Sequence, residues 1–279
     1  MVRPDGSAIS AGDTAVPLPL ASVTKPIVAY ACLVAIEEGA ISLDDAAGPP
    51  GSTVAHLLAH ASGLDLDDDR VLSPPGVRRR YSNIGFEILA THLARRTAMP
   101  WEEYVRDAVT RPLGMAATTV APPAGSGFAS TVEDLSLFVA ELLTPRLIDR
   151  STLDRARSNQ VGDLDGVVPG FGMQRPDPWG LGFEIRGTKS PHWTGRRNSP
   201  STFGHFGRSG TFLWVDPVVR VSGVAEELRG PAVAGVGLVG LGDLAFGPWA
   251  AELWPAIGDE VLLGLTGLQE RPAPQEPGR

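Results

Sequence analysis

Residues 20–39 read LASVTKPIVAYACLVAIEEG, and this stretch predicts the central element of the fold. Ser22 is a residue type that favours a helix start, and Pro26 is tolerated in a first turn. The residues that follow are apolar on nearly every side, so the helix expected from Ser22 to Gly39 should be buried in the middle of the protein. Lys25 lies one helical turn after Ser22, so its amine and the Ser22 hydroxyl share one face of that helix.

An amine held beside a serine hydroxyl points to nucleophilic chemistry. In a partly dry site, Lys25 can lose its proton and then activate the Ser22 hydroxyl. A helix start also supplies the positive end of the helix dipole, and a backbone N–H there can help to hold an oxyanion. The alternative interpretation is that Ser22 only caps the helix. Motifs further along the chain are needed to separate the two.

Two more short motifs follow in a fixed order. YSN at residues 81–83 begins a stretch that reads as a helix. HFG at residues 205–207 precedes GTFLWVDP, residues 210–217, whose alternation predicts a strand. Each motif alone has a simpler explanation in packing, helix capping or a structural histidine. The three motifs together, in this order, favour a catalytic site.

These motifs identify a family resemblance. The chain resembles the serine β-lactamase and penicillin-binding-protein superfamily, on its class C and esterase side. SVTK is similar to the SxxK motif, LLAHASGL at 57–64 to the stretch that commonly follows it, and YSN to YxN. GHFGRSGTFLWVDP at 204–217 is similar to the strand that carries KTG or HxG. The resemblance runs from about residue 20 to 217 and resumes at FGPWAAELWPAI, residues 246–257.

The resemblance implies three catalytic residues. Ser22 matches the nucleophile, and Lys25 matches its hydrogen-bond partner and proton acceptor. Tyr81 matches the phenolic general base and acid that acts with the lysine. A tyrosine of ordinary pKa is a poor base at neutral pH, but a nearby ammonium favours the phenolate. We therefore expect Lys25 and Tyr81 to titrate as a coupled pair.

The resemblance also implies four substrate-binding positions. Asn83 matches the residue that binds the lysine and the acyl side chain. His205 replaces the usual lysine of the third motif, and as an imidazolium it would bind acidic substrates better at lower pH. Gly207 completes this motif. The backbone N–H groups of Ser22 and Arg208 would form the oxyanion hole.

The pattern of the chain predicts an α/β (α+β) protein. The resemblance implies a β-lactamase-like fold, in which helices flank an antiparallel sheet and a helical lobe is inserted. We expect one domain over residues 1–268, with its sheet part at about 1–40 and 178–268 and its lobe at about 41–177. Residues 269–279 read as a disordered tail. Helical patterns occur at 53–60, 83–98, 101–109 and 131–142, and a closing helix at 249–265.

Two segments depart from the family pattern. Only 21 residues precede Ser22, which indicates either a truncated start or a sheet that is open at one edge, and we expect the open edge. VVRVSGVAEELRGP, residues 218–231, stands where relatives carry a tighter turn and another strand.

Composition limits the partners. Among 279 residues, 43% are hydrophobic and 20% charged, which is typical of a globular protein. A net charge of -8 argues against nucleic acid and anionic membrane as partners. No segment reaches the length of a membrane span, and no export signal opens the chain, so a cytoplasmic location is expected. The expected partner is a small ester or amide substrate, with the oligomeric state left open.

No metal or cofactor is expected. His56 and His60 are spaced i, i+4, but no third ligand accompanies them, so helix packing is favoured. DLDDDR at 65–70 does not fit a calcium loop and reads as a solvated acidic turn. GVGLVG at 235–240 lies too close to the C-terminus to open a dinucleotide-binding unit and reads as a glycine-rich strand or turn. Cys32 is the only cysteine, which excludes an internal disulfide.

Three function classes follow. The leading one is a cytosolic esterase or amidase that works through an acyl-enzyme. A true β-lactamase or a D-amino-acid peptidase is the related alternative. A non-catalytic binding or scaffold protein is the alternative of another class, and the intact Ser22, Lys25 and Tyr81 argue against it.

The motif order predicts that Ser22 is the residue that becomes acylated. A fluorophosphonate probe should add one adduct, which peptide mapping by mass spectrometry should place on Ser22. Ser22→Ala should abolish both labelling and turnover, because it removes the hydroxyl that Lys25 is expected to activate. An adduct on a different serine would show that the nucleophile has been misassigned.

Overall fold

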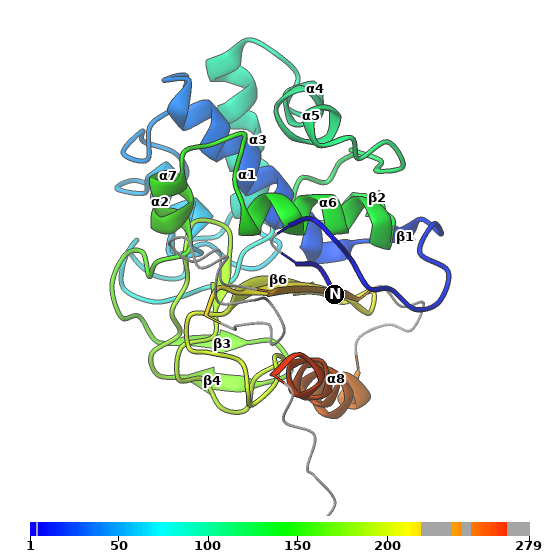
Figure 1. Ribbon diagram of the computed structural model, residues 1–279. Coiled ribbons are helices and arrows are strands. Elements are labelled where there is room, and N and C mark those ends of the chain that lie inside the picture. Colours follow the sequence, from blue (N-terminus) through cyan, green and yellow to red (C-terminus); the bar gives the residue numbers. More distant parts are fainter. Residues whose placement is uncertain (4, 219–235, 241–246, 267–279) are drawn as a thin grey trace, which may run out of the picture.

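The computed structural model describes residues 1–3, 5–218, 236–240 and 247–266. Helices lie above a four-stranded sheet, and one long helix lies beneath it (Figure 1). The helices are η1 (Ala21–Val23, 3-10), α1 (Thr24–Glu37), α2 (Val54–Leu58), α3 (Ile84–Thr97), α4 (Trp101–Val105), η2 (Arg106–Thr110, π), α5 (Arg111–Leu113), α6 (Val132–Leu143), α7 (Arg150–Ala156) and α8 (Pro248–Thr266). The strands are β1 (Leu18–Pro19), β2 (Ala129–Ser130), β3 (Gly166–Val168), β4 (Gly172–Gln174), β5 (Glu184–Ile185), β6 (Phe203–Gly207), β7 (Thr211–Asp216) and β8 (Val236–Gly240).

Strands β5 to β8 pair in chain order, and every pair is antiparallel. All residues of β6 and β7 are buried, so the sheet is covered on both faces. The alternation of β7 divides its side chains: Leu213 and Val215 join the core that contains α1, whereas Phe212 and Trp214 join a second cluster with Trp254 of α8. This period of two explains why a sheet with two apolar faces forms from this segment.

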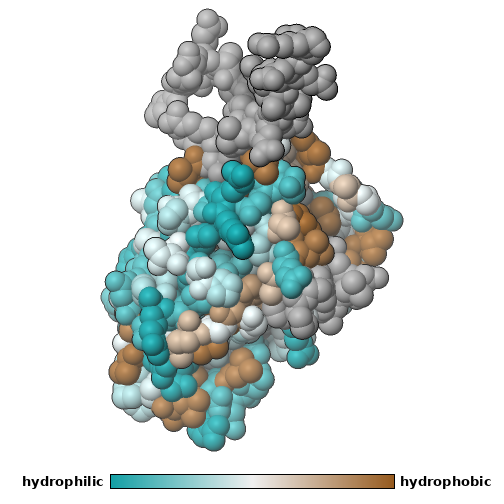
Figure 2. Space-filling view, turned by 90° about the horizontal axis from the view of Figure 1, so that it is seen from below, coloured by the Kyte–Doolittle hydropathy of each residue, from teal (hydrophilic) through white to brown (hydrophobic). Residues whose placement is uncertain are grey.

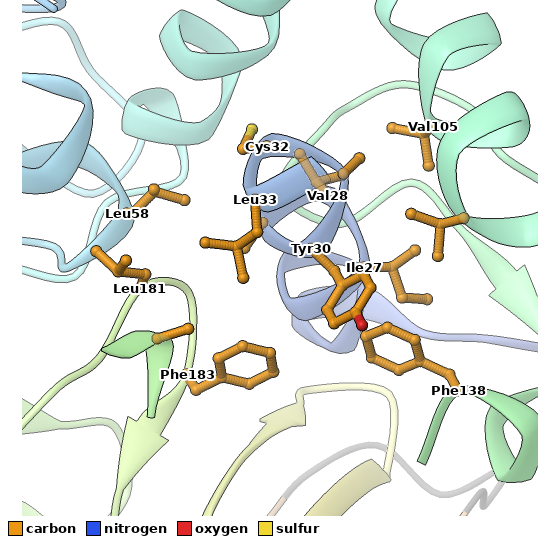
Figure 3. Packing of buried hydrophobic residues seen from close by; sticks show 14 of the residues in the cluster. Ile27, Val28, Tyr30, Cys32, Leu33, Leu58, Val105, Phe138, Leu181 and Phe183 are labelled. Atoms are coloured by element: carbon orange, nitrogen blue, oxygen red, sulfur yellow. The ribbon is translucent and has the colours of Figure 1, made fainter. Parts of the chain in front are cut away.

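Helix α1 is the centre of the larger core (Figure 3). Every residue from Thr24 to Ala35 is buried, as the apolar stretch predicted. The Tyr30 hydroxyl, which would otherwise be an unpaired polar group, donates to Glu141 Oε1 on α6 at 2.7 Å. Burial raises the pKa of the Cys32 thiol to about 12, so this cysteine acts as a small apolar side chain.

Several sequence predictions are confirmed, and others need correction. The helices expected at 53–60, 83–98 and 131–142, the strands after residue 178 and the closing helix are all present, with shifted ends. Ser22 does not cap α1: it lies in the 3-10 turn η1, and Val23 precedes the first residue of α1 without a side-chain cap bond. The helix predicted at 101–109 continues through η2 to Leu113. Helix α7 and the β3–β4 hairpin carried no signal strong enough to predict them.

The sheet edge that was expected to be open is bridged by the N-terminal segment. The Val2 N–H donates to the Gly237 carbonyl of β8 at 2.8 Å, and the Gly237 N–H donates back at 3.0 Å. Residues 236–240 of the GVGLVG segment form β8, as expected for a glycine-rich strand. The predictions for residues 219–231, for Gly235 and for the tail 269–279 lie outside the described residues.

The described surface mixes hydrophilic and hydrophobic residues when seen from below (Figure 2). On α8, Leu253 and Ile257 are exposed apolar residues. Among the described residues, no helix has both the length and the apolar character needed to cross a membrane.

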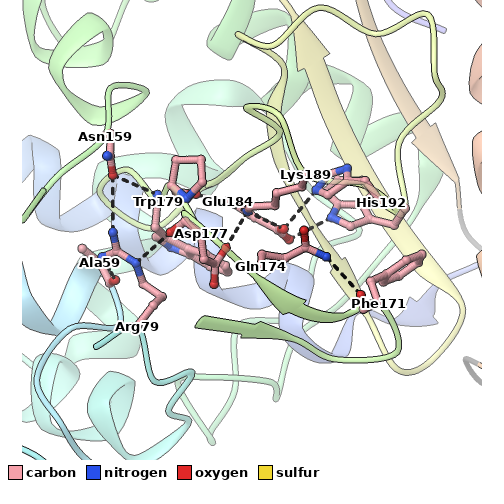
Figure 4. Close-up of polar contacts among 12 residues, drawn as sticks. Ala59, Arg79, Asn159, Phe171, Gln174, Asp177, Trp179, Glu184, Lys189 and His192 are labelled. Atoms are coloured by element: carbon pink, nitrogen blue, oxygen red, sulfur yellow. Dashed lines mark hydrogen bonds and ion pairs between the residues drawn. The ribbon is translucent and has the colours of Figure 1, made fainter. Parts of the chain in front are cut away.

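A buried ionic network connects β5 to the loops around it (Figure 4). Lys189 Nζ lies 2.7 Å from Asp177 Oδ1 and 2.8 Å from Glu184 Oε1, and none of these three side chains is more than 2% exposed. His192 Nε2 and Trp193 Nε1 also contact the Glu184 carboxylate, at 3.0 and 2.8 Å. Burial opposes the charge of Glu184, but Lys189 and His192 together hold its pKa below the usual value.

Lys189→Met should destabilise the protein strongly. The variant removes the ammonium that contacts both buried carboxylates, Asp177 and Glu184, and breaking a buried ion pair in this way costs about 3–5 kcal/mol. The free energy of unfolding from urea titration followed by circular dichroism measures the loss. Arg175→Met is the control, because the Arg175–Asp165 ion pair is exposed (71% and 49%) and such pairs contribute about 1 kcal/mol or less. Equal losses in the two variants would contradict the role given to the network.

Candidate active site

Four segments converge on the start of α1. They are the turn η1 with Ser22, the YSN segment before α3, the end of β6, and the loop at residues 121–127. The Leu20 N–H donates to the Phe128 carbonyl at 2.8 Å, and the Phe128 N–H donates to Thr24 Oγ1 at 3.2 Å. These bonds attach the loop to η1 and α1, so the loop reaches Lys25.

The Lys25 amine has three oxygen neighbours. Lys25 Nζ lies 2.6 Å from Asn83 Oδ1, 2.8 Å from the Gly125 carbonyl and 3.3 Å from Ser22 Oγ. The two carbonyl oxygens can only accept. In the neutral amine both N–H bonds are therefore directed to Asn83 and Gly125, and the lone pair is left for Ser22. This geometry makes Lys25 a base for the Ser22 proton.

The environment of Lys25 favours loss of its proton. The side chain is fully buried in the structure, and this burial lowers the pKa of Lys25 to about 7. The carboxylates of Glu87 and Asp67 oppose the shift. A substantial fraction of the amine is thus neutral at physiological pH, which an exposed lysine would not provide.

Tyr81 lies beside the same amine. Lys25 Nζ is 4.7 Å from the centroid of the Tyr81 ring, and the Tyr81 hydroxyl is 3.3 Å from His205 Nε2. Burial raises the pKa of Tyr81, while its hydrogen bond with Ser22 lowers it by less. The expectation that Lys25 would favour the phenolate is therefore wrong: Tyr81 is protonated, and its hydroxyl can give a proton to a departing group.

His205 is a neutral imidazole in this site. Its Nδ1 lies 2.7 Å from the Phe206 carbonyl, which can only accept, so Nδ1 carries the proton and Nε2 accepts from Tyr81. Burial and the charge of Lys25 lower the pKa of His205 to about 3. The predicted imidazolium that would bind acidic substrates is corrected accordingly, because His205 is buried and contacts Tyr81.

Asn83 is oriented by contacts on both ends of its amide. Its Oδ1 accepts from Lys25, and its Nδ2 donates to Asp67 Oδ1 at 2.7 Å. The reverse orientation would place two acceptors against each other at Asp67, so the assignment of oxygen and nitrogen follows from the contacts.

The β6–β7 turn holds the nucleophile turn in place. Thr211 Oγ1 donates to the Leu20 carbonyl at 2.8 Å, and Ser209 Oγ donates to the Pro19 carbonyl at 2.7 Å. A Cβ atom on Gly207 would lie 2.3 Å from the Leu20 carbonyl, so only glycine permits this approach. Ala21, next to Ser22, has φ of 44°, a left-handed conformation that these contacts maintain.

Arg208 directly follows β6 and is exposed. Its backbone N–H therefore lies at the end of the strand that packs on η1. This arrangement suits the predicted pairing of the Ser22 and Arg208 amides around an oxyanion, which stays a prediction.

Sequence reasoning missed several residues around the site. Gly125 supplies a carbonyl to Lys25, and no side chain marks such a role. The His60 ring lies 4.3 Å from the Tyr81 ring, and its Nδ1 accepts from the Ser82 N–H. Trp179 contacts the rings of His60, Tyr81 and His205. The LLAHASGL motif was the available signal for His60.

The two histidines that could have formed a metal pair have separate roles. His56 caps α2 through a reciprocal contact with Thr53, whereas His60 packs beneath Tyr81. Within the described residues, no group of three or more histidine, cysteine, aspartate or glutamate side chains is placed to hold a metal ion.

Comparisons with known proteins match the part of the chain that carries these motifs. The family model described as Beta-lactamase matches residues 13–226. A crystal structure of a beta-lactamase from Mycobacterium bovis is 49% identical, covers 95% of this chain and 93% of that chain, and has a TM-score of 0.87. A hydrolase with promiscuous acyltransferase activity has a TM-score of 0.68 at 17% identity, over 90% of this chain and 86% of that chain.

Among curated proteins, a D-alanyl-D-alanine-carboxypeptidase/endopeptidase from Escherichia coli K12 is 26% identical over 140 residues. This match covers 37% of this chain and 36% of the relative. The chain thus matches only about a third of the length of that curated relative.

The pKa of Lys25 predicts how the rate depends on pH. Because the neutral amine is the active form, kcat/KM for p-nitrophenyl butyrate should rise with pH and reach half its maximum near pH 7. Glu87→Gln removes a carboxylate that favours the ammonium, so this limb should move to lower pH. Glu102→Gln, on α4, is the control and should leave the profile in place. If the rise of kcat/KM with pH does not move in Glu87→Gln, the titration belongs to a group other than Lys25.

Proposed function

The chain belongs to the β-lactamase family and is a serine hydrolase, and we propose that it cleaves small esters through an acyl-enzyme on Ser22. One observation carries the proposal. Lys25 Nζ lies 2.6 Å from Asn83 Oδ1, 2.8 Å from the Gly125 carbonyl and 3.3 Å from Ser22 Oγ, so a neutral amine that donates to the two carbonyls keeps its lone pair for Ser22. A hydroxyl with a base held in this way is an activated nucleophile.

The proposed reaction begins when Lys25 accepts the Ser22 proton. Ser22 Oγ then forms a bond to the ester carbonyl carbon, and the backbone amides of Ser22 and Arg208 receive the oxyanion. Tyr81 gives its proton to the leaving alcohol as the ester C–O bond breaks. The proton on Lys25 restores Tyr81, and His205 orients the phenol through its Nε2.

Hydrolysis of the acyl-enzyme repeats these steps with water. The same base accepts a proton from the water, whose oxygen attacks the acyl carbon. The bond between Ser22 Oγ and that carbon then breaks, the proton held by Lys25 returns to Ser22 Oγ, and the acid product leaves. No metal or cofactor takes part in this scheme, because the amine and the phenol carry every proton.

Esters are favoured over β-lactams by the third motif. The fixed cation that usually meets the carboxylate of a β-lactam at the third motif is replaced by neutral His205, which is directed to Tyr81. An alkoxide also departs more easily than an amide nitrogen. A simple acyl group further leaves room for the hydrolytic water, whereas an opened β-lactam keeps a bulky ring beside the serine.

A β-lactamase is the second candidate, because the similar Mycobacterium bovis structure is described as a beta-lactamase. The curated relative makes D-amino-acid peptide hydrolysis a related candidate. The cytosolic location in our proposal rests on the expectation from the sequence. Fractionation of cells would test it.

Ester turnover should exceed β-lactam turnover by about a hundredfold or more in kcat/KM, or about 3 kcal/mol of barrier. The measurement compares p-nitrophenyl acetate and butyrate with nitrocefin, and Ser22→Ala gives the background. Nitrocefin turnover equal to or faster than ester turnover would favour the β-lactamase. If no substrate is turned over and Ser22 stays unlabelled, the result would favour a non-catalytic protein.

A further inference from the structure

The acidic loop DLDDDR, which the sequence presented as a solvated turn, is bound to the YSN segment. Ser82 Oγ donates to the Asp65 carbonyl at 2.7 Å. The Asn83 N–H donates to the Leu66 carbonyl at 2.6 Å. Asn83 Nδ2 then donates to Asp67 Oδ1 at 2.7 Å. Two hydrogen bonds to the loop backbone thus fix the loop, and the Asp67 carboxylate has a defined place beside Asn83.

Asp67 is connected to the nucleophile by three consecutive hydrogen bonds. They run from Asp67 to Asn83 (2.7 Å), from Asn83 to Lys25 (2.6 Å) and from Lys25 to Ser22 (3.3 Å). Asp67 has no ion-pair partner among the described residues, because Arg70, the cation of this loop, pairs with Asp65 at 2.5 Å. Its negative charge therefore acts on Lys25 and also on a substrate that occupies the site.

The residue that Asp67 contacts indicates which part of the substrate meets this charge. The family resemblance implies that Asn83 binds the acyl side chain of the substrate. Asn83 Nδ2 donates to Asp67 Oδ1 at 2.7 Å, so an acyl group bound at Asn83 lies beside the Asp67 carboxylate.

We propose that Asp67 selects substrates by the charge of the acyl group, so that the enzyme prefers esters whose acyl group carries an ammonium and discriminates against anionic acyl groups. This inference rests on the proposed acyl-enzyme at Ser22. A carboxylate attracts the cation and repels the anion. Because Asp67 is exposed to solvent, each charge changes the rate by about fivefold or less.

The test uses three p-nitrophenyl esters with the same leaving group. Their acyl groups are 4-(trimethylammonio)butyryl, its uncharged isostere 5,5-dimethylhexanoyl, and 4-sulfobutyryl. None of these acyl groups carries a nucleophile that would displace the leaving group internally. The kcat/KM values are measured at low ionic strength, with the Ser22→Ala rate subtracted. We expect the cationic ester to exceed the anionic ester by about tenfold in the wild-type enzyme.

Asp67→Asn keeps an oxygen for Asn83 and removes the charge, so the ratio should fall toward one. Asp69→Asn is the matched control, because it removes a charge of the same exposed loop that has no bond to Asn83. It should preserve most of the ratio. Added salt should reduce the wild-type ratio, since screening weakens the interaction of exposed charges. Melting temperatures check that all variants are folded.

Four outcomes would overturn the inference. A wild-type ratio near one, an unchanged ratio in Asp67→Asn, or an equal fall in Asp69→Asn would each show that Asp67 does not select charge. A uniform loss on all three esters in Asp67→Asn would show that Asp67 only positions Asn83. If Ser22 is acylated but the enzyme shows no preference for the charge of the acyl group, the proposed function stands without this inference. If no ester is turned over through Ser22, both fail.

Discussion

The site depends on the burial of a single amine. Lys25 lies on the first turn of a helix whose residues from Thr24 to Ala35 are all buried, and its ammonium form loses hydration there. Two carbonyl oxygens offset part of this cost and also determine where the amine points. The same burial that brings the pKa to about 7 therefore creates a base with a defined direction.

The nucleophile is placed by the sheet more than by its own helix. Ser22 belongs to a short 3-10 turn, and this turn is held through the carbonyls of Pro19 and Leu20 by two hydroxyls of the β6–β7 turn. Gly207 permits the contact because it has no Cβ atom. The third motif therefore has a structural task, which is to hold a left-handed residue and a serine against the end of β6.

The rings around Tyr81 explain why it is a proton donor. His60, Trp179 and His205 surround the phenol, and this burial favours its neutral form. Trp179 also lies 5.7 Å from the Lys189 ammonium, so the buried ionic network packs against the rings of the site. The network therefore contributes to the packing of the site, and Lys189 supplies the ammonium that contacts its two buried carboxylates.

The sequence by itself determined which segments carry the chemistry. A buried helix with SxxK, a YSN before a helix and an HFG before an alternating strand were all visible, because short motifs and periodicity depend on neighbours in the chain. Tertiary structure decided the protonation states, since the pKa values of Lys25, Tyr81 and His205 depend on burial among distant segments. It also decided the roles of Gly125 and Asp67, whose contacts with Lys25 and Asn83 span loops that no local pattern connects.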